Sequence, residues 1–346
     1  MKKFLAILLS LVFVIGMFSG CGAQKEETGA PAEKAPAEAP AKQENAKEPA
    51  KTEPLKWSLA TSSSGSAPNT LGSIIANVIN KNQDVIELSA QVTAGFNENM
   101  YLVKDGDVQI GMASSLDMAR AYNQAEGFED EAFKNMRLIC LYAIEYGHQV
   151  TRKDSGIKTL DDLVGKKLNI NTPASTTAFR NRMIIEAADT TEEDYQIFEI
   201  ATSGAMDGLR DKTFDATFNG MSIGNASVTE LSTQIPVHLI SIPEDVYEKM
   251  NELSDGAFGY GAIPAGTYNG QDEDCYTWVG YNLLYAREDT DADAVYSLCK
   301  TFWESLDELG AADSGLAALS IDMATFGPDV PWHPGAERYL KEIGAL

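Results

Sequence analysis

Apolar and polar residues follow one another along the chain in a pattern of short strands and helices. Residues 57–60, 86–92 and 108–112 have the composition and alternation of strands. Between the first two, apolar residues recur at the spacing that places them on one face of a helix. They are Leu71, Ile74, Ile75, Val78 and Ile79. Repeated strand–helix–strand units of this length predict an α/β fold with a largely parallel sheet.

The same plan occurs a second time. The Ser-rich residues 61–66 lead from the first strand into a helix, and residues 171–177 lead from a strand at 168–170 into another helix. Later in each half, a helix ends in a turn, an aspartate and a short strand, at residues 100–112 and 206–218. The repetition predicts two similar α/β lobes, each with its sheet flanked by helices.

The length of the folded part also favours two lobes, because roughly 290 residues exceed what one small core usually organises. We predict that residues 55–146 and 279–346 form lobe 1 and that residues 147–278 form lobe 2. The two crossings, near residues 145–149 and 276–281, are the expected hinge. The last helices should complete lobe 1 through an apolar stripe formed by Val295, Leu298, Phe302, Leu306 and Leu309.

The amino terminus has the pattern of an export signal. A basic start precedes the apolar residues 4–18, and Ser19 and Gly20 stand before Cys21. This arrangement resembles the bacterial lipoprotein signal, so we predict a signal peptide at residues 1–20 and lipidation of Cys21. The alternative is ordinary secretory cleavage near Gly20. Residues 21–54 should form a disordered tether, rich in Ala, Pro, Glu and Lys. The predicted location is extracytoplasmic, lipid-anchored to the outer face of the cell membrane.

The net charge argues against two kinds of partner, and the cysteine count limits the possible disulfides. The 346 residues carry a net charge of −24, which argues against nucleic acid and anionic lipid head groups as partners. After Cys21, three cysteines remain, and three cannot all pair. Cys140 and Cys299 stand in apolar patterns and should be buried. Whether Cys140 pairs with Cys275 is left open.

The two Ser/Thr-rich loops are the candidate ligand-binding elements. Each stands at the carboxyl end of a strand and the start of a helix, where ligands collect in open α/β sheets. Helix starts offer free N–H groups and a positive dipole end to an anion. Simple helix capping by Ser or Thr is the alternative. His148, His238 and His333 lack the spacing of metal ligands, so we predict no metal, no cofactor and no enzyme activity.

Five segments of the folded part form a recognisable pattern. The most specific is residues 263–272. The others are residues 61–66 followed by Leu71 and Gly72, residues 107–115, residues 154–166 and residues 333–336. Together they resemble the TAXI family of solute receptors, the substrate-binding subunits of one class of TRAP transporters. The resemblance runs over nearly the whole folded part.

The resemblance implies a type II periplasmic-binding-protein fold, in which two lobes close over a small solute and deliver it to a permease driven by an ion gradient. Known ligands of the family include glutamate-like and 2-oxo-dicarboxylate anions. The expected protein is thus a monomeric receptor for a small anionic solute, with a TRAP-type permease as partner. The alternatives are a binding protein of an ABC importer or sensor kinase with the same fold, and an exported enzyme.

The resemblance also suggests ligand-binding residues. Those that match the family's cleft motifs are Ser63, Ser64, Gly65, Ser114, Ser115, Ser175, Thr176 and Thr177. We also expect Asn99 to face the solute with Glu98 turned away, and Phe96 or Tyr142 to pack on the rest of the solute. Ser66, Arg180 and Asn219 complete the predicted site. Arg180, about one turn into its helix, could reach a carboxylate or lie in solvent.

This sequence departs from the family pattern at several positions in these loops. Pro68 and Asn69 replace two aromatic residues, and Ser66 and Ala174 replace glycines. Ala178 replaces an acidic residue. The departures change the expected wall of the pocket.

Overall fold

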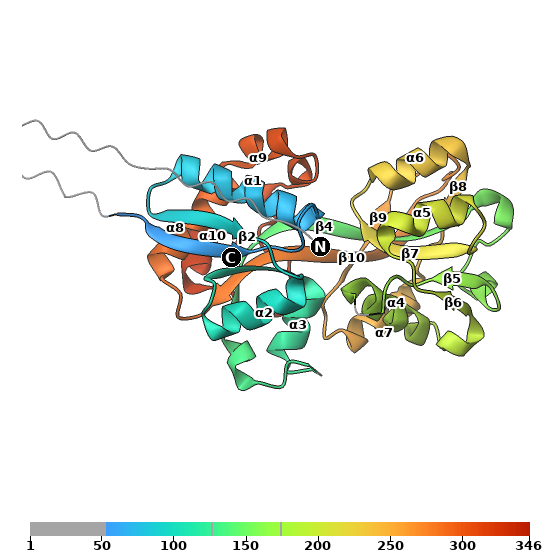
Figure 1. The fold of residues 1–346 in the computed structure, drawn as a ribbon, viewed down its shortest axis with the longest axis horizontal. Coiled ribbons are helices and arrows are strands. Elements are labelled where there is room, and N and C mark those ends of the chain that lie inside the picture. Colours follow the sequence, from blue (N-terminus) through green and yellow to red (C-terminus); the bar gives the residue numbers. More distant parts are fainter. Residues whose placement is uncertain (1–52, 126, 174) are drawn as a thin grey trace, which may run out of the picture. The chain divides into compact units, whose positions relative to one another are not determined.

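The computed structural model describes residues 53–125, 127–173 and 175–346 (Figure 1). The predicted signal peptide, the lipidation at Cys21 and most of the tether lie outside these residues. Ten strands of the described residues form one mixed sheet. They are β1 (Leu55–Ala60), β2 (Ile86–Gln91), β3 (Ile110–Ser114), β4 (Met136–Arg152), β5 (Lys167–Asn169), β6 (Gln196–Phe198), β7 (Ala216–Met221), β8 (Val237–Leu239), β9 (Gly259–Ile263) and β10 (Cys275–Arg287).

The strand order shows that one plan is used twice. The main path runs β2-β1-β3-β10-β4-β7-β5-β6, with β8 beside β4 and β9 beside β10. The trios β2-β1-β3 and β6-β5-β7 have the same order and are both parallel. The long strands β4 and β10 join them in antiparallel register. The predicted two-lobed α/β fold is confirmed. The expectation of a largely parallel sheet in each lobe is wrong, because β4 and β10 run antiparallel to their neighbours and join both trios into one mixed sheet.

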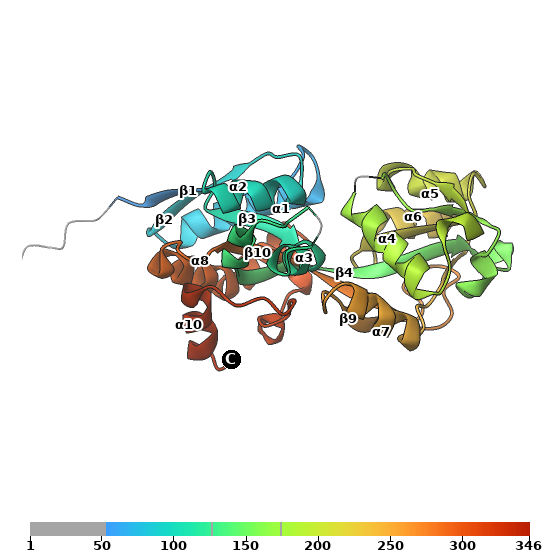
Figure 2. The ribbon, with the colours of Figure 1, turned by 90° about the horizontal axis from the view of Figure 1, so that it is seen from below.

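Helices cover the sheet on both sides. In lobe 1, α2 and α3 lie on one side, and α1 and α9 lie on the other (Figure 1). In lobe 2, α4 and α7 lie opposite α5 and α6. Figure 2 shows α8 and α10 in lobe 1, near the carboxyl terminus. The helices are α1 (Ala67–Asn82), α2 (Phe96–Asp105), α3 (Ser115–Tyr122), α4 (Thr176–Ala187), α5 (Thr202–Arg210), α6 (Ala226–Gln234), α7 (Glu244–Leu253), α8 (Ala292–Glu304), α9 (Leu306–Ala312) and α10 (Pro334–Glu342).

Each lobe has its own buried core. The lobe 1 core draws on the amino-terminal elements and on α8, whose Val295, Leu298 and Phe302 are fully buried as predicted. Lobe 2 has one core on each side of its sheet. Leu116 and Ala119 of α3 belong to one of those lobe 2 cores, so α3 packs across the junction between the lobes. The residue boundaries of the lobes stay a prediction.

β4 and β10 carry the chain across that junction (Figure 1). Along β4, the partner changes from β10 to β7 at Tyr146, which is opposite both Val279 and Met221. The register between β4 and β10 shifts beside Asn282, which is where β10 begins to pair with β3. The two predicted hinge segments are therefore paired neighbours in the sheet. Hinge motion itself stays a prediction.

The cysteines of the folded part are buried thiols. Cys140, Cys275 and Cys299 are buried and unpaired in the described part of the chain. Burial raises the pKa of the Cys275 thiol to about 12.

None of the helices within residues 53–125, 127–173 and 175–346 is long and apolar enough to cross a bilayer.

Candidate functional site

Three helices begin at serines near the carboxyl ends of the parallel strands. Ser66, Ser114 and Ser175 are the N-caps of α1, α3 and α4. Each hydroxyl oxygen accepts a hydrogen bond from the backbone N–H three residues on, at 3.3, 3.1 and 3.1 Å. These hydroxyl groups therefore act as helix caps, and each serine stabilises the start of the helix that follows it.

Charged side chains meet between the lobes at Arg180. This residue of α4 is only 4% exposed, and its Nη1 donates to Glu145 Oε2 over 3.3 Å. Glu145, on β4, also accepts through Oε1 from Asn282 Nδ2 on β10, at 2.8 Å. One carboxylate thus links the helix of lobe 2 to both strands that cross the junction. Burial lowers the pKa of Arg180, and the charge of Glu145 opposes that shift.

Trp278 packs against the face of the Arg180 guanidinium. Gly147 and Gly220 are directly opposite each other on β4 and β7. A Cβ on Gly147 would lie 2.4 Å from the indole Nε1 of Trp278, and a Cβ on Gly220 would lie 2.8 Å from its Cη2. The indole therefore packs against both glycines, because a side chain at either position would clash with it. The guanidinium of Arg180 lies 4.0 Å from the centre of the indole ring, at cation–π distance.

A second acidic group faces lobe 2 from the first turn of α3. Asp117 is 2% exposed, and its Oδ2 accepts from the Ser114 hydroxyl over 2.6 Å. Its Oδ1 accepts from Thr176 Oγ1 of α4 over 3.4 Å, which joins the two lobes. Burial raises the pKa of the Asp117 carboxyl, and the hydrogen bond from Ser114 opposes part of that shift.

We call Asp117, Tyr142, Glu145, Arg180, Trp278 and Asn282 the interlobe cluster. Several of its buried polar atoms find no hydrogen-bond partner among the described residues. They are Nε and Nη2 of Arg180, Nε1 of Trp278, Oδ1 of Asn282 and the hydroxyl of Tyr142. Buried polar atoms are usually paired, so these atoms have hydrogen-bonding capacity that a bound molecule would be able to use. Burial, followed by the nearby charges of Glu145 and Asp117, raises the pKa of Tyr142 well above its usual value.

The structure brings some predicted site residues into this cluster and leaves others apart. Arg180 is a member, Thr176 contacts Asp117, and Ser114 donates to Asp117. Ser115 is buried next to it and accepts from the backbone N–H of Tyr281 over 3.2 Å. Thr177 is half-buried, whereas Ser63, Ser64 and Gly65 are exposed. Gly65 has a φ of +78°, which a glycine accommodates without strain.

The position of Asn99 differs from the prediction that its side chain contacts the solute. It does not face a solute: it is fully buried, and its Nδ2 lies 3.1 Å or less from the carbonyl oxygens of Ala60, Thr61 and Met112. Its Oδ1 accepts from Thr93 Oγ1 over 2.7 Å. The side chain therefore ties the ends of β1 and β3 together beneath the first loop. Glu98, as expected, turns away and accepts from the backbone of Ala94.

Two other predicted contacts also have structural roles here. Asn219 is 1% exposed, and its amide bonds to the hydroxyl oxygens of Thr202 and Thr217 at the carboxyl edge of lobe 2. Phe96 is half-buried and packs against the lobe 1 core. Neither residue contacts the interlobe cluster through a hydrogen bond, so both expectations of direct solute contact stay predictions.

Sequence reasoning missed Asp117, Glu145, Trp278 and Asn282. One signal was available, because Glu145 interrupts the apolar run of residues 138–144 with a charge. A charged residue in a buried strand usually has a partner or a function. For the other three, nothing local to the sequence distinguishes a cluster residue from an ordinary one.

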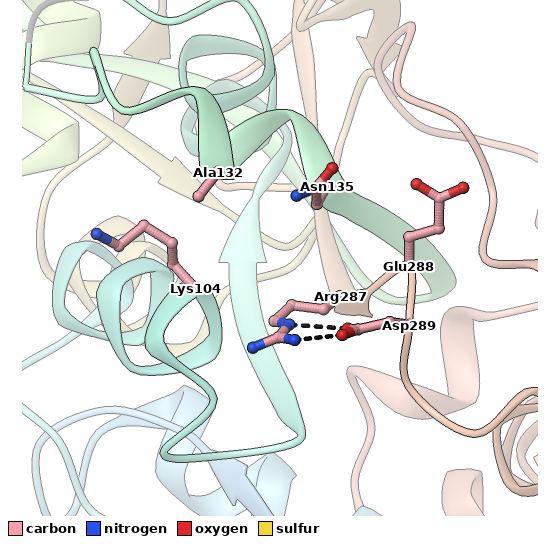
Figure 3. A pocket seen from close by; sticks show the side chains of 6 residues that line it. All are labelled: Lys104, Ala132, Asn135, Arg287, Glu288 and Asp289. Atoms are coloured by element: carbon pink, nitrogen blue, oxygen red, sulfur yellow. Dashed lines mark hydrogen bonds and ion pairs between the residues drawn. The ribbon is translucent and has the colours of Figure 1, made fainter.

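A surface hollow of about 440 Å³ lies elsewhere, in lobe 1 (Figure 3). Lys104, Arg287 and Glu288 are among the residues that line it. Arg287 pairs with Asp289, and Lys104 Nζ lies 2.9 Å from Asp130 Oδ2. Glu288 pairs with Arg137. The charges of the hollow are thus neutralised by their neighbours, which gives it little to offer a charged solute.

No group of three or more His, Cys, Asp and Glu residues is arranged to hold a metal ion within the part of the chain that the structure describes. The interlobe cluster offers one arginine, two carboxylates, an amide, a phenol and an indole. These groups can bind a small polar molecule by hydrogen bonds and charge.

The chain belongs to the NMT1-like family, which matches residues 59–344. Its fold is also similar to solved structures. The periplasmic aliphatic sulphonate binding protein SsuA from Escherichia coli is 12% identical, with a TM-score of 0.42 over 77% of this chain and 82% of that one. A TctC solute binding protein from Polaromonas is 11% identical, with a TM-score of 0.47 over 85% and 98%. A binding protein component of an ABC phosphonate transporter from Pseudomonas aeruginosa is 11% identical, with a TM-score of 0.46 over 76% and 79%. At this level of similarity, nothing about this chain's ligand follows from those proteins.

Proposed function

We propose that this protein is an extracytoplasmic solute-binding receptor that captures a small anionic solute in the interlobe cluster and delivers it to a membrane transporter. Membership of the NMT1-like family and the two-lobed fold support the receptor class. The observation that carries the proposal is the free edge of Arg180. Its Nε and Nη2 are buried and have no partner in the described part of the chain.

That edge has the geometry of a carboxylate receptor. Nε and Nη2 are the two donors on one side of the planar guanidinium, and they match the two oxygens of a carboxylate. Glu145 occupies only Nη1, at 3.3 Å, and Trp278 fixes the plane from its face. The guanidinium is therefore oriented before a solute arrives, which reduces the entropy lost on binding.

The carboxylates of the cluster restrict what can bind. Glu145 offsets the charge of Arg180, and Asp117 is a further buried acid. A solute with a carboxylate for Arg180 and a hydrogen-bond donor for Asp117 would satisfy both, whereas a second carboxylate beside Asp117 would be repelled. A glutamate-like solute fits this arrangement better than a simple dicarboxylate does.

Entry of a solute requires the lobes to part, because the side chain of Arg180 is only 5% exposed. The two strands that cross the junction are the natural place for rotation, and the hydrogen bond from Thr176 to Asp117 that joins α4 to α3 is long, at 3.4 Å. Closure over a solute would restore the burial of the cluster. The binding energy would then come partly from excluding water around the charged pair.

The partner and the location are part of the proposal. The sequence resemblance favours a TRAP-type permease driven by an ion gradient, with the receptor anchored through Cys21. An ABC importer or a sensor kinase is the second candidate partner, and a neighbouring gene for a fused permease would decide between them. An exported enzyme is a third possibility, and turnover of a bound solute would identify it.

A thermal-shift panel of amino acids, dicarboxylates and sugar acids tests the function. A bound solute at one hundred times its dissociation constant should stabilise the protein by about 2.7 kcal/mol. The shift should fall by about half or more in Arg180→Met. It should persist in Arg182→Met, which removes an exposed arginine of the same helix that pairs with Glu192 and Glu199. Equal shifts in both variants would contradict the proposed site.

A further inference from the structure

Tyr268 makes an unusual connection inside lobe 2. It belongs to residues 263–272, the most specific segment of the sequence, yet the site described above does not use it. Its side chain is 2% exposed. Its hydroxyl lies 2.8 Å from Nε2 of the fully buried His148 and 3.0 Å from the backbone nitrogen of Asn225.

The directions of these hydrogen bonds follow from the groups that can only accept or only donate. The carbonyl oxygen of Tyr146 can only accept, so His148 Nδ1, 2.8 Å away, carries a proton and donates to it. Burial lowers the pKa of His148, so its ring is neutral and Nε2 accepts the proton of the Tyr268 hydroxyl. The backbone N–H of Asn225 can only donate, so the Tyr268 oxygen accepts there. A single chain of donors thus runs from Asn225 through Tyr268 and His148 to Tyr146.

One end of this hydrogen-bond chain adjoins the interlobe cluster, and the other end lies in the turn after β7. Tyr146 follows Glu145 on β4 and is the residue at which β4 changes partner. Asn225 caps α6 and ends the turn after β7, which carries Gly220. A Cβ on Gly220 would lie 2.1 Å from Glu145 Oε2 and 2.7 Å from Arg180 Nη2, so the backbone there directly supports the ion pair.

The loop that carries Tyr268 is itself firmly held. Gln271 Nε2 lies 3.0 to 3.2 Å from the carbonyl oxygens of Ile263, Pro264 and Glu273 and shares its two protons among them. Asn269 Nδ2 donates to Ser232 O over 2.8 Å, which attaches the loop to α6. The hydroxyl of Tyr268 therefore projects from a fixed frame rather than from a loosely held loop.

We propose that Tyr268 is a positioning residue for the solute site. It braces the turn after β7 against β4, on the face of the sheet opposite Trp278, and so fixes the backbone on which Glu145 and Arg180 rest. This inference rests on the proposed function for its biological meaning. The mechanical connection can be measured without any solute.

The test compares Tyr268→Phe with Tyr247→Phe in the mature protein. Tyr247 is a matched control, because its hydroxyl donates to a backbone carbonyl of the same lobe, Phe258 O, at 3.0 Å. We expect amide exchange of residues 221–227 to rise about tenfold or more in Tyr268→Phe only, since the acceptor of the Asn225 N–H is gone. We also expect the NMR resonance of the Arg180 Nε–H to move in that variant and not in the control.

Unchanged exchange and an unmoved Arg180 resonance in Tyr268→Phe would overturn the inference. So would equal changes in Tyr247→Phe, because they would indicate a general loss of packing. Titration with L-glutamate adds a functional readout, with an affinity about fivefold or more weaker expected in Tyr268→Phe. An unchanged affinity alongside faster exchange would reduce Tyr268 to a structural role. Failure of the wild type to bind L-glutamate would count against the proposed glutamate-like solute, while the solute-free measurements would still decide the role of Tyr268.

Discussion

Gly147 and Gly220 face each other across β4 and β7, and the indole of Trp278 lies over both. Arg180 in turn stacks on that indole. The position of a charged group between the lobes thus depends on two residues without side chains. This dependence makes the glycine pair a sensitive place to test the site.

Gly220→Ala should weaken the site and the fold together. The added methyl group would meet Glu145 Oε2 at 2.1 Å and Arg180 Nη2 at 2.7 Å. Overpacking of this kind costs about 1–3 kcal/mol. Chemical denaturation measures the loss. Gly204→Ala is the control, because its methyl group would meet only Cγ2 of the exposed Ile200, at 3.0 Å, and alanine favours the helix. A harmless Gly220→Ala would show that the ion pair does not rest on this backbone.

Asn99→Ala should destabilise the protein without acting on the solute directly. It removes an amide that bonds to three backbone carbonyls and to Thr93. Leaving buried acceptors unpaired costs roughly 1–3 kcal/mol per group, so we expect a loss of about 2–4 kcal/mol. The exposed neighbour Asn97 supplies the control variant, Asn97→Ala, which should change the free energy of unfolding by less than about 0.5 kcal/mol. Equal losses in both variants would contradict the structural role of Asn99.

Asp117→Asn should stabilise the protein at neutral pH. Burial raises the pKa of Asp117, so the native state holds its proton more tightly than the unfolded state does. The resulting stability is complete below the unfolded pKa and is lost as the pH rises through the native pKa. The advantage of the variant should therefore be larger at pH 7.5 than at pH 4. Urea melts at the two pH values measure it, and a pH-independent difference would show that the carboxyl is not strained by burial.

His148 should make the fold sensitive to acid. Burial lowers its pKa from 6.5 to about 4, although the hydrogen bond to the Tyr146 carbonyl and the charge of Glu145 oppose part of that shift. The contribution is present above pH 6.5 and is lost as the pH falls toward 4, by an amount on the order of 3 kcal/mol. His148→Gln should flatten the stability profile in that window. A slope retained in His148→Gln would assign the acid sensitivity to other groups.

Local patterns predicted the architecture well. The apolar stripe of residues 71–79 became α1, and the strands at 57–60 and 168–170 became β1 and β5 at the centres of the two parallel trios. Periodicity reports such elements because burial of one face is a local requirement. The repeated plan was visible for the same reason.

The site was less predictable, because its residues are brought together by the sheet. Arg180 and Glu145 are 35 positions apart, and Glu145 and Asn282 are 137 apart. Helix starts were located correctly, but the serines there proved to cap their own helices. Asn99 illustrates the limit well, since a buried amide and a ligand-facing amide have the same appearance in a sequence.

The central claim is that the free edge of Arg180 receives an anionic solute. Calorimetric titration of the solute with the largest thermal shift, into wild type, Arg180→Met and Arg182→Met, tests it most directly. We predict that Arg182→Met binds like wild type and that Arg180→Met loses at least about tenfold in affinity, because charge-assisted hydrogen bonds contribute roughly 1.5–3 kcal/mol. Wild-type affinity in a folded Arg180→Met variant would contradict the account.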